Sequence, residues 1–246
     1  MKLVKACMSF FMLLALSVMP SSAEKLSAKQ ILQNSAKQYS TVQDYSVDAK
    51  ITAKSKSMHI PEMNLKVFFK NPDKLHIEST DGFAVLPRQG AFFGNPVSEL
   101  LKSSEIVLGQ PGRVMGEDCY SVKVTLRRNE GPSDSMDWRD EKPMRRGTQG
   151  ITSTVWIDKK DFLVRQTLTT SEYSPSVKVR ITYRKIDNRY WMPDTTQADI
   201  SASPIPNINN RMHHGSRRNQ PMTVTMKFSN YKVNTGLDDK LFDTRK

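Results

Sequence analysis

Apolar and polar residues alternate along most of this chain. Residues 45–53 give the clearest example, because every second position is apolar (Tyr, Val, Ala, Ile and Ala) and the positions between are polar. A repeat of two residues is typical of a β-strand that buries one side and exposes the other. The same alternation returns in residues 63–69, 75–77, 120–126, 151–158, 162–170, 177–183 and 223–228. Many short strands without intervening helices predict one large antiparallel sheet, curled or closed.

One helix is expected before the strands. Ser27 and Gln30 have the spacing of a capping box, in which each side chain accepts a hydrogen bond from the backbone amide of the other residue. Small or apolar residues then recur on one helical face at Ala28, Ile31, Leu32, Ser35, Ala36 and Tyr39. This pattern predicts an amphipathic helix that begins after Ser27 and ends near Ser40.

Two kinds of segment interrupt the alternation. Residues 83–112 are too apolar for an ordinary surface loop, and Asn95 and Pro96 suit the cap and first turn of a short helix. We expect this segment to lie over an apolar opening. The insertions at residues 128–150 and 201–221 are instead polar and poor in strand-forming residues, so we expect them to be mobile.

The N-terminus has the features of a secretory signal peptide. Two lysines precede the apolar run Ser9–Val18, and small residues then precede a cleavage site after Ala23. The run is short for an uncleaved membrane helix, and Cys7 lies before it, whereas a lipid-attachment cysteine would follow it. We therefore expect residues 1–23 to be removed and residues 24–246 to form a single exported domain in the periplasm.

Charge and cysteine content narrow the class of partner. The chain has a formal net charge of +12 at pH 7, which favours anionic partners. Export and the lack of aromatic residues interleaved with arginine argue against nucleic acid. Anionic lipid head groups or an acidic partner protein are the better candidates.

Cys119 is the only cysteine after the signal peptide, so no internal disulfide can form.

The sequence holds no motif that points to catalysis. His59, His76, His213 and His214 have no metal-ligand spacing with a carboxylate. No serine lies in a Gly-x-Ser-x-Gly setting, and no glycine-rich loop suits a phosphate. We expect no catalytic residue, no metal and no cofactor. A hydrolase stays the weaker alternative, because catalytic groups can assemble from distant positions.

The apolar face of such a sheet is larger than one helix can cover. It either encloses a cavity for an apolar ligand or packs against the first helix as an ordinary core, and the pattern alone does not decide between the two. If the assigned register of any strand is wrong by one residue, the residues expected to be buried in that strand lie on its solvent-facing side instead.

Four further segments stand out by their order and spacing. They are FFKNPDKLHIE at Phe68–Glu78, VWIDKKDFLVRQ at Val155–Gln166, YWMPDT at Tyr190–Thr195 and KFSNYKVNTGLDDKLF at Lys227–Phe242. Together with the exported, helix-first organisation, they resemble outer-membrane lipoprotein-sorting proteins of the LolA-like superfamily. The resemblance covers most of residues 26–242 outside the polar insertions. It implies a mainly β (α+β) fold, a half-open antiparallel β-barrel of roughly ten to eleven strands with an N-terminal helix and short lid helices.

For function, the resemblance implies an apolar cavity that shields acyl chains during transit through the periplasm. The lipid-binding residues expected to line it are Leu65, Val67, Phe69, Leu75, Ile77, Val122, Val124, Val155, Ile157, Val179, Ile181, Met226 and Phe228. The lid is expected at Phe92, Phe93, Leu100 and Leu101. The carriers typically have an arginine immediately before the proline of the β-turn that is NPD here, and in this chain that position is Asn71. This departure leaves lipids other than lipoproteins open as cargo.

The expected function is that of a periplasmic carrier, which binds acyl chains of lipoproteins or other lipids non-covalently and moves them toward the outer membrane. Its partners would be a lipidated protein or phospholipid cargo and inner- and outer-membrane components of a transfer pathway. The alternative is an envelope sensor or adaptor that binds an acidic or lipidated partner protein. In both cases the tail would tuck Leu237, Leu241 and Phe242 against the barrel, with Asp238 and Asp239 as solvated turn residues rather than a catalytic pair.

Overall fold

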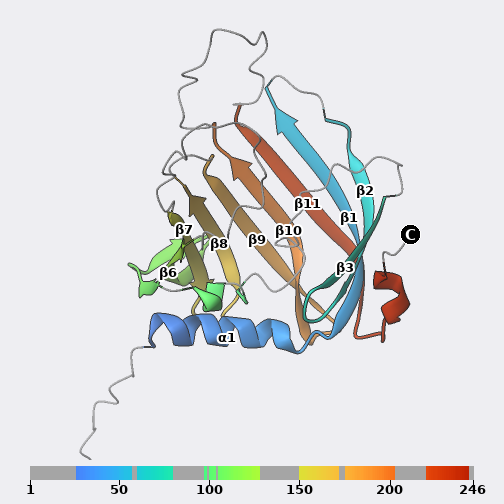
Figure 1. Ribbon diagram of the computed structural model, residues 1–246, viewed down its shortest axis with the longest axis horizontal. Helices are drawn as coiled ribbons and strands as arrows, with labels where there is room; N and C mark the ends of the chain where they lie inside the picture. The colour runs from blue at the N-terminus through green and yellow to red at the C-terminus, as the bar shows by residue number, and fades with distance from the viewer. Residues whose placement is uncertain are drawn as a thin grey trace, which may run out of the picture.

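The structure, a computed structural model, describes residues 26–56, 60–79, 97–98, 100–103, 105–127, 150–171, 175–202 and 220–243. One α-helix precedes a single large sheet (Figure 1). The elements are α1 (Ala28–Ser40), β1 (Asp44–Ser55), β2 (Met63–Lys70), β3 (Lys74–Ser79), β4 (Glu105–Leu108), β5 (Gly112–Val114), β6 (Glu117–Arg127), β7 (Gly150–Asp158), β8 (Val164–Thr170), β9 (Val177–Ile186), β10 (Tyr190–Ile200) and β11 (Met222–Val233). Two short 3₁₀ helices are η2 (Leu100–Lys102) and η4 (Asp239–Phe242).

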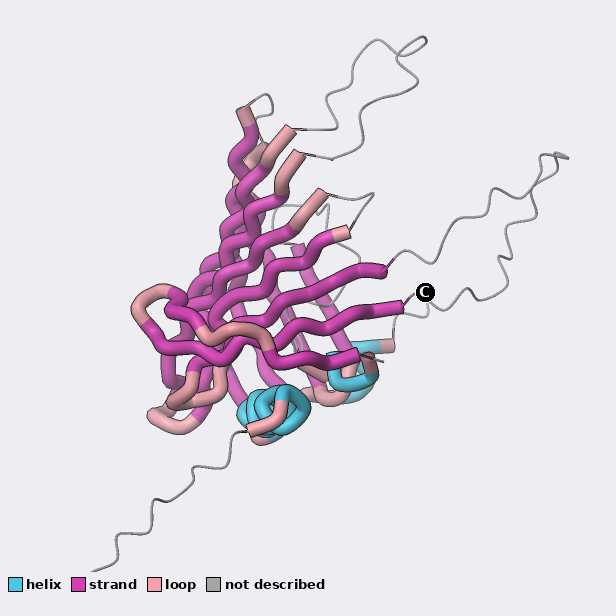
Figure 2. Tube along the Cα trace, turned by 90° about the vertical axis from the view of Figure 1, so that its left-hand side faces the viewer, coloured by secondary structure: helices cyan, strands magenta, loops and turns pink. Residues whose placement is uncertain are grey.

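All eleven strands belong to one antiparallel sheet. Its order is β3-β2-β1-β11-β10-β9-β8-β7-β6-β4, and β5 pairs with β6 beside β4. The pairing of β1 with β11 joins the first and last strands of the chain in the middle of the sheet. Among the described strands, β3 and β4 form the two edges, so the sheet curls without closing (Figure 2). The predicted half-open β-barrel of ten to eleven strands is confirmed.

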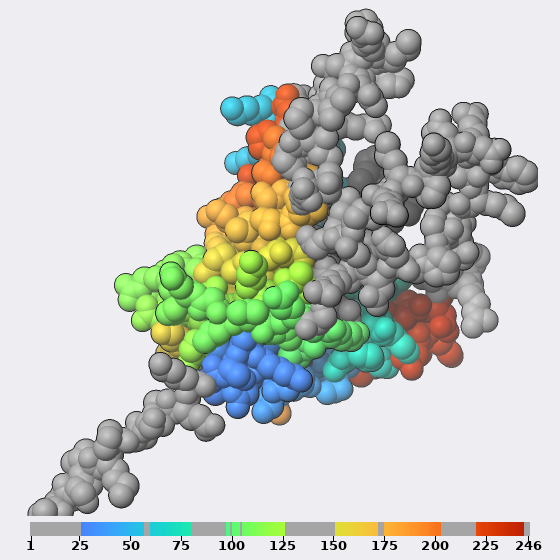
Figure 3. Space-filling view, turned by 60° about the vertical axis from the view of Figure 1, so that its left-hand side comes forward, coloured from blue at the N-terminus to red at the C-terminus, as the bar shows by residue number. Residues whose placement is uncertain are grey.

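Helix α1 forms where the capping pattern predicts it. The Ser27 amide donates to Gln30 Oε1 at 2.7 Å, and the Gln30 amide donates to Ser27 Oγ at 3.2 Å, which satisfies two amides at the helix N-terminus. The helix lies across one end of the strands (Figure 1). Helix α1 contacts β4, β6 and η2. Figure 3 shows the helix, in blue, against the green segment that contains these elements. Its buried residues are Ala28, Ile31, Leu32 and Ser35.

The segment expected to cover an opening is only partly described. Phe92, Phe93, Asn95 and Pro96 lie outside the described residues, as do residues 1–25, 128–149 and 203–219. Within the described part, Leu100 and Leu101 belong to the 3₁₀ helix η2. For residues 105–108 the expectation that the segment 83–112 lies over an opening is wrong. These residues form β4, which hydrogen-bonds to β6 at the edge of the sheet. Among the described residues, no helix is both long and apolar enough to cross a membrane.

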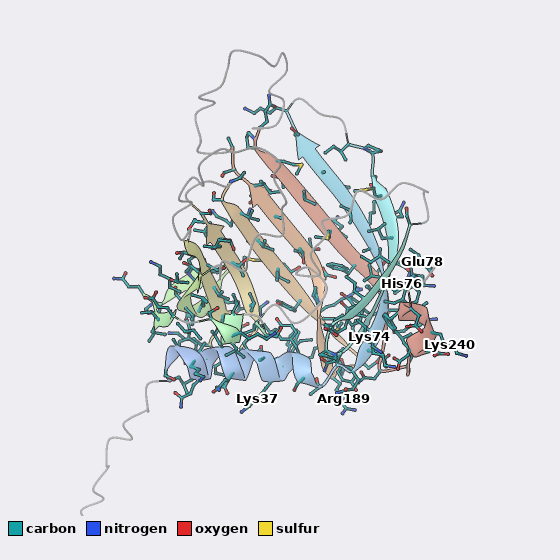
Figure 4. All side chains as sticks on the ribbon, viewed as in Figure 1. Lys37, Lys74, His76, Glu78, Arg189 and Lys240 are labelled. Carbon is teal, nitrogen blue, oxygen red and sulfur yellow. The ribbon has the colours of Figure 1, made fainter. Side chains whose placement is uncertain are left out.

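The tail after β11 returns to the β2–β3 hairpin. Asp239 Oδ1 lies 2.7 Å from Lys70 Nζ and 3.0 Å from Lys74 Nζ, and Lys70 Nζ also donates to the Leu237 carbonyl at 2.8 Å. These hydrogen bonds, that of Lys70 first, lower the pKa of the exposed Asp239 carboxyl. Asp238 caps η4 by accepting from the Lys240 amide at 3.0 Å. Figure 4 shows Lys74 on β3 near Lys240 on η4. Each aspartate therefore has a structural contact of its own, and Leu237, Leu241 and Phe242 are half-buried as the tail packs.

Candidate ligand-binding site on the inner face of the sheet

The cross-strand register places every residue expected to line a cavity on one face of the sheet, called the inner face below. Leu65 pairs with Ala49, which pairs on its other side with Phe228. In the other half, Val122 pairs with Val155. Directly paired residues point to the same side of a sheet, so these rows share a face. The full set on the inner face is Leu65, Val67, Phe69, Leu75, Ile77, Val122, Val124, Val155, Ile157, Val179, Ile181, Met226 and Phe228.

Two hydrophobic clusters divide this inner face. The first cluster lies on β1, β2, β10 and β11 and includes Leu65, Val67, Phe69, Met226 and Phe228. The second cluster joins α1 to β6, β7, β8 and β9 and includes Val122, Val124, Val155, Ile157 and Ile181.

Helix α1 covers the second cluster and excludes solvent from it. Val122, Val124, Val155 and Ile157 are all 0% exposed, and they pack with Ile31 and Leu32 of α1, which are also 0% exposed. Of the two possibilities left open by the pattern, packing against the first helix therefore applies to this half of the sheet. Contact of these residues with a ligand stays a prediction.

Three of the expected lining residues keep partial access to solvent. Leu75 and Ile77 pack beside the first cluster, and Val179 packs beside the second, each half-buried. Polar groups also lie on the inner face at β7 and β8, where Ser153 Oγ and Thr169 Oγ1 are 3.1 Å apart and hydrogen-bonded to each other. Because this pair is satisfied internally, it does not prevent an apolar ligand from lying alongside.

A cavity of about 600 Å³ lies where the C-terminal half of α1 meets β1, β2 and β10, and it is called the helix-end cavity below. Its volume falls in the range of small-molecule sites. Phe69 and Leu101 are the expected lining and lid residues that border it. Its other walls are Gln33, Ala36, Lys37, Tyr39, Ser40, Val42, Tyr45, Asn71, Trp191, Met192 and Pro193. Lys37 and Arg189 lie at this end of the molecule (Figure 4).

The sequence analysis missed most of these walls. Tyr39 and Tyr45 were assigned to the helix face and to a strand pattern, but Trp191, Met192 and Pro193 lie in a segment without alternation. That segment contains a β-bulge, since the register with β9 shifts between Pro193 and Thr195. The YWMPDT sequence carried only the family resemblance, and no pattern within it predicts the cavity.

A pair of tyrosines fastens α1 to the sheet beside this cavity. The hydroxyls of Tyr39 on α1 and Tyr183 on β9 are 2.8 Å apart, and the Tyr183 hydroxyl donates to the Val164 carbonyl at 2.9 Å. The Arg165 guanidinium lies over the Tyr183 ring, 5.5 Å from its centroid. Burial raises the pKa of Tyr39 to about 12 and that of Tyr183 well above its usual value. Both hydroxyls therefore stay protonated at neutral pH and keep this contact.

Aromatic stacking supports the part of the cavity wall that Tyr45 and Phe69 provide. The rings of Tyr45 and Phe69 stack with centroids 5.3 Å apart, and Tyr231 packs against Tyr45 at 5.9 Å. Burial raises the pKa of Tyr45 and of Tyr231, so neither phenol ionises near neutral pH. This wall offers rigid aromatic surface without a charge, which suits an apolar ligand.

The histidines and the cysteine considered in the sequence lie apart from one another or outside the described residues. No group of three or more His, Cys, Asp or Glu side chains within the described part could hold a metal ion. His76 lies on β3, 3.4 Å from Glu78, while His59, His213 and His214 are outside the described residues. Cys119 is 0% exposed, burial raises the pKa of its thiol, and its Sγ donates to the Glu117 carbonyl. These observations describe an inert thiol.

Solved structures share this architecture. A LolA superfamily protein from Nitrosomonas europaea superposes with a TM-score of 0.53 and 11% identity, over 88% of this chain and 97% of that chain. A DUF1329 family protein from Desulfovibrio piger superposes with a TM-score of 0.50 and 15% identity, over 89% of this chain and 98% of that chain. No protein-family model and no curated protein matches the sequence. The chain therefore has the LolA-like fold, a curled, open antiparallel sheet with its N-terminal helix across one end.

Proposed function

We propose that this protein is an exported carrier, which binds acyl chains of lipoproteins or other lipids against the inner face of its sheet and moves them through the periplasm toward the outer membrane. The observation that carries the proposal is the inner face itself. Two apolar clusters cover most of it between β3 and β6, with hydroxyl-bearing residues such as Thr196 and Thr167 between them, and the helix-end cavity of about 600 Å³ opens beside it. The binding involves no reaction and no cofactor.

The energetics support a non-covalent carrier. Each methylene moved from water into an apolar site contributes about 0.8 kcal/mol, so ~10 methylenes contribute roughly 8 kcal/mol before the costs of ordering. Affinity of that order holds a lipid in transit and still permits its release at an acceptor. The donor and acceptor are expected to be components of the inner and outer membranes.

The position of Asn71 supports lipid cargo in a broad sense. Asn71 borders the helix-end cavity in the β2–β3 turn, and its backbone N–H donates to the backbone carbonyl of Gln43 at 2.7 Å. An asparagine here supplies no positive charge at the cavity, whereas the lipoprotein carriers that the sequence resembles have an arginine. We therefore do not restrict the cargo to lipoproteins.

Native mass spectrometry with lipid extraction tests the proposal directly. Residues 24–246 would be purified from a periplasm without detergent. We expect a co-purifying lipid or acylated peptide at about one per chain. A ligand-free mass, together with no uptake of added phospholipid or lipopeptide, would refute the carrier function.

A pair of matched variants then tests the binding face. Val179→Glu places a carboxylate on the inner face, where Val179 is half-buried beside the second cluster. Thr154→Glu places the same charge on the outer face of β7, opposite Lys123. We expect Val179→Glu to abolish lipid binding and Thr154→Glu to preserve it, with both proteins folded by circular dichroism. Full lipid occupancy in a folded Val179→Glu protein would show that the lipid does not bind on the inner face at Val179.

A second candidate function is an adaptor that binds an acidic partner protein. It is favoured by the outer face, where Lys50 and Lys227 stand directly opposite each other on β1 and β11. Glu62 neutralises Lys50 at 2.6 Å, but no carboxylate of the described residues pairs with Lys227, so an anionic partner could bind there. Deleting residues 203–219, which include several basic residues, separates the two functions. A carrier keeps its lipid after this deletion, whereas an adaptor that grips through the segment loses its partner.

A further inference from the structure

A second cavity, of about 590 Å³, lies at the opposite end of the strands from α1 and is called the rim cavity below. At this end β1 and β10 finish and β9 and β11 begin (Figure 1). Its walls are Lys54, Ser55, Lys56, Leu168, Ser176, Lys178, Asp199, Ile200, Ser201, Pro221, Met222 and Thr223. Nothing in the proposed acyl-chain site requires this cluster of lysines.

The three lysines of the rim cavity lack a carboxylate partner within the described part of the chain. Among the described residues, neither Lys54, Lys56 nor Lys178 forms an ion pair or a side-chain hydrogen bond, and all three are exposed. Lys50 and Lys70, by contrast, pair with carboxylates at 2.6 Å and 2.7 Å. Three unpaired ammonium groups around one hollow raise the local concentration of anions.

Of the described residues that line the rim cavity, Asp199 is the one acid, and its charge is already compensated. Its carboxylate pairs with Arg180 and also accepts from Gln197 Nε2 at 3.1 Å and from Thr223 Oγ1 at 2.9 Å. Desolvation acts to raise the pKa of Asp199, but these hydrogen bonds and the Arg180 charge outweigh it and the pKa is lowered. The acid therefore leaves the lysines of the cavity unmatched.

The rim cavity connects the two faces of the sheet. Lys54 pairs with Thr223, and Asp199 pairs with both Thr223 and Lys178, so these residues form a single row on the outer face. The next row, Ser55, Met222 and Ile200, belongs to the inner face. A ligand in this cavity thus meets ammonium and hydroxyl groups on one side and the start of the apolar inner face on the other.

We propose that the rim cavity binds a phosphate ester, the head group of a phospholipid whose acyl chains lie on the inner face. This assignment rests on the proposed carrier function. Lysine binds a phosphate as a point charge, and three ammonium groups around one cavity complement the negative charge of a phosphate ester. Arg180, on β9, is already paired with Asp199. Hydroxyls of Ser176 and Ser201, fixed by a mutual hydrogen bond of 2.9 Å, add polar surface beside the lysines.

The test compares two lipids that share their acyl chains. Residues 24–246 are incubated with equal amounts of dioleoylphosphatidylglycerol and dioleoylglycerol, and the lipid bound to the re-isolated protein is extracted and counted by mass spectrometry. We expect the wild type to be enriched in the phospholipid. A triple variant, Lys54→Gln, Lys56→Gln and Lys178→Gln, should lose that enrichment at least about fivefold and still take up dioleoylglycerol. The enrichment should also fall as salt is raised, because exposed charges are screened.

The control is a second triple variant with the same change of charge. Lys123→Gln, Lys227→Gln and Lys232→Gln remove three exposed lysines of β6 and β11 that do not line the cavity. This variant should keep the wild-type enrichment. If both triple variants lose it equally, net charge rather than the rim cavity selects the lipid, and the proposal is overturned.

A second arm uses glycerol phosphate in calorimetric titration, without lipid. Binding that depends on the three cavity lysines supports a phosphate site, and stronger binding of phosphatidylglycerol than of glycerol phosphate identifies the source as a lipid head group rather than a free phosphate. If no lipid is taken up by any protein but glycerol phosphate still binds through these lysines, the carrier function fails and the phosphate site stands. Equal uptake of both lipids without glycerol phosphate binding overturns the site and leaves the carrier function intact.

Discussion

The hairpin between β7 and β8 depends on one buried carboxylate. Asp158 and Arg165 form an ion pair, with Nε 2.8 Å from Oδ2, and their side chains are only 2% and 14% exposed. The other oxygen, Oδ1, accepts from the Asp161 amide at 2.6 Å within the turn. Removing the carboxylate by Asp158→Ala therefore leaves a guanidinium with little access to water and a turn amide without its acceptor.

The expected cost follows from this burial. Breaking a buried ion pair by removing one partner costs about 3–5 kcal/mol, because the remaining charge is uncompensated. The 14% exposure of Arg165 lets water reach part of the guanidinium, which places the estimate near the lower limit, about 3 kcal/mol. Arg113 and Asp118 form a comparison pair of the same chemistry at 3.1 Å, but their side chains are 69% and 65% exposed. Asp118→Ala should cost less than about 1 kcal/mol.

Urea unfolding of both variants, followed by circular dichroism, measures this difference. The wild type and the two variants should unfold with similar dependence on denaturant, so that the shift in midpoint reports stability. A double variant, Asp158→Ala with Arg165→Met, should recover part of the loss because it also removes the unpaired charge. If Asp158→Ala costs no more than Asp118→Ala, burial does not govern these pairs and the reasoning is wrong.

Two further predictions concern the ends of the sheet. Tyr183→Phe removes the hydroxyl that contacts both Tyr39 and the Val164 carbonyl, so it should lower the unfolding free energy by about 1–3 kcal/mol in urea, and an unchanged midpoint would refute the fastening of α1. The lowered pKa of Asp199 means that its carboxylate stabilises the fold above its unfolded pKa and loses this effect as the pH falls through its folded pKa. Asp199→Asn should therefore destabilise the protein by less than about 1 kcal/mol at pH 7, since the side chain is 34% exposed, and the difference from the wild type should shrink below about pH 4. A difference that is constant with pH would show that the charge of Asp199 does not stabilise the fold.

The strands were predictable because their physics is local. A strand with one buried side needs an apolar residue at every second position, and residues 45–53 of β1, 63–69 of β2 and 177–183 of β9 keep this rule. The side of the sheet on which Leu65 and Val179 lie could therefore be predicted from the sequence. The capping box of α1 is equally local, because Ser27 and Gln30 are three residues apart and bond only to each other's backbone.

The helix-end cavity was not predictable in the same way. Met192 is buried in the first cluster although it lies next to a bulge, where the alternation that guides prediction is lost. β4 was also missed, because Val107 and Leu108 are apolar but nearly half exposed at the sheet's edge, at 49% and 48%. Both features depend on which distant segment lies beside them, and no short-range pattern records that.

The distance between the two cavities sets how they can share a ligand. The rim cavity includes Ile200 and the helix-end cavity includes Trp191, at opposite ends of β10, which are about 30 Å apart at roughly 3.3 Å per residue. One leaflet of a bilayer is about half of the ~30 Å hydrocarbon thickness, so a single acyl chain reaches about 15 Å. A phospholipid held by its head group at the rim would therefore end near Thr196, four residues along β10, and beside Ile181, which pairs with Thr196. Its chains would cover Val179 but stop short of Trp191. The helix-end cavity must then receive a different part of the cargo, either a longer chain or a second ligand.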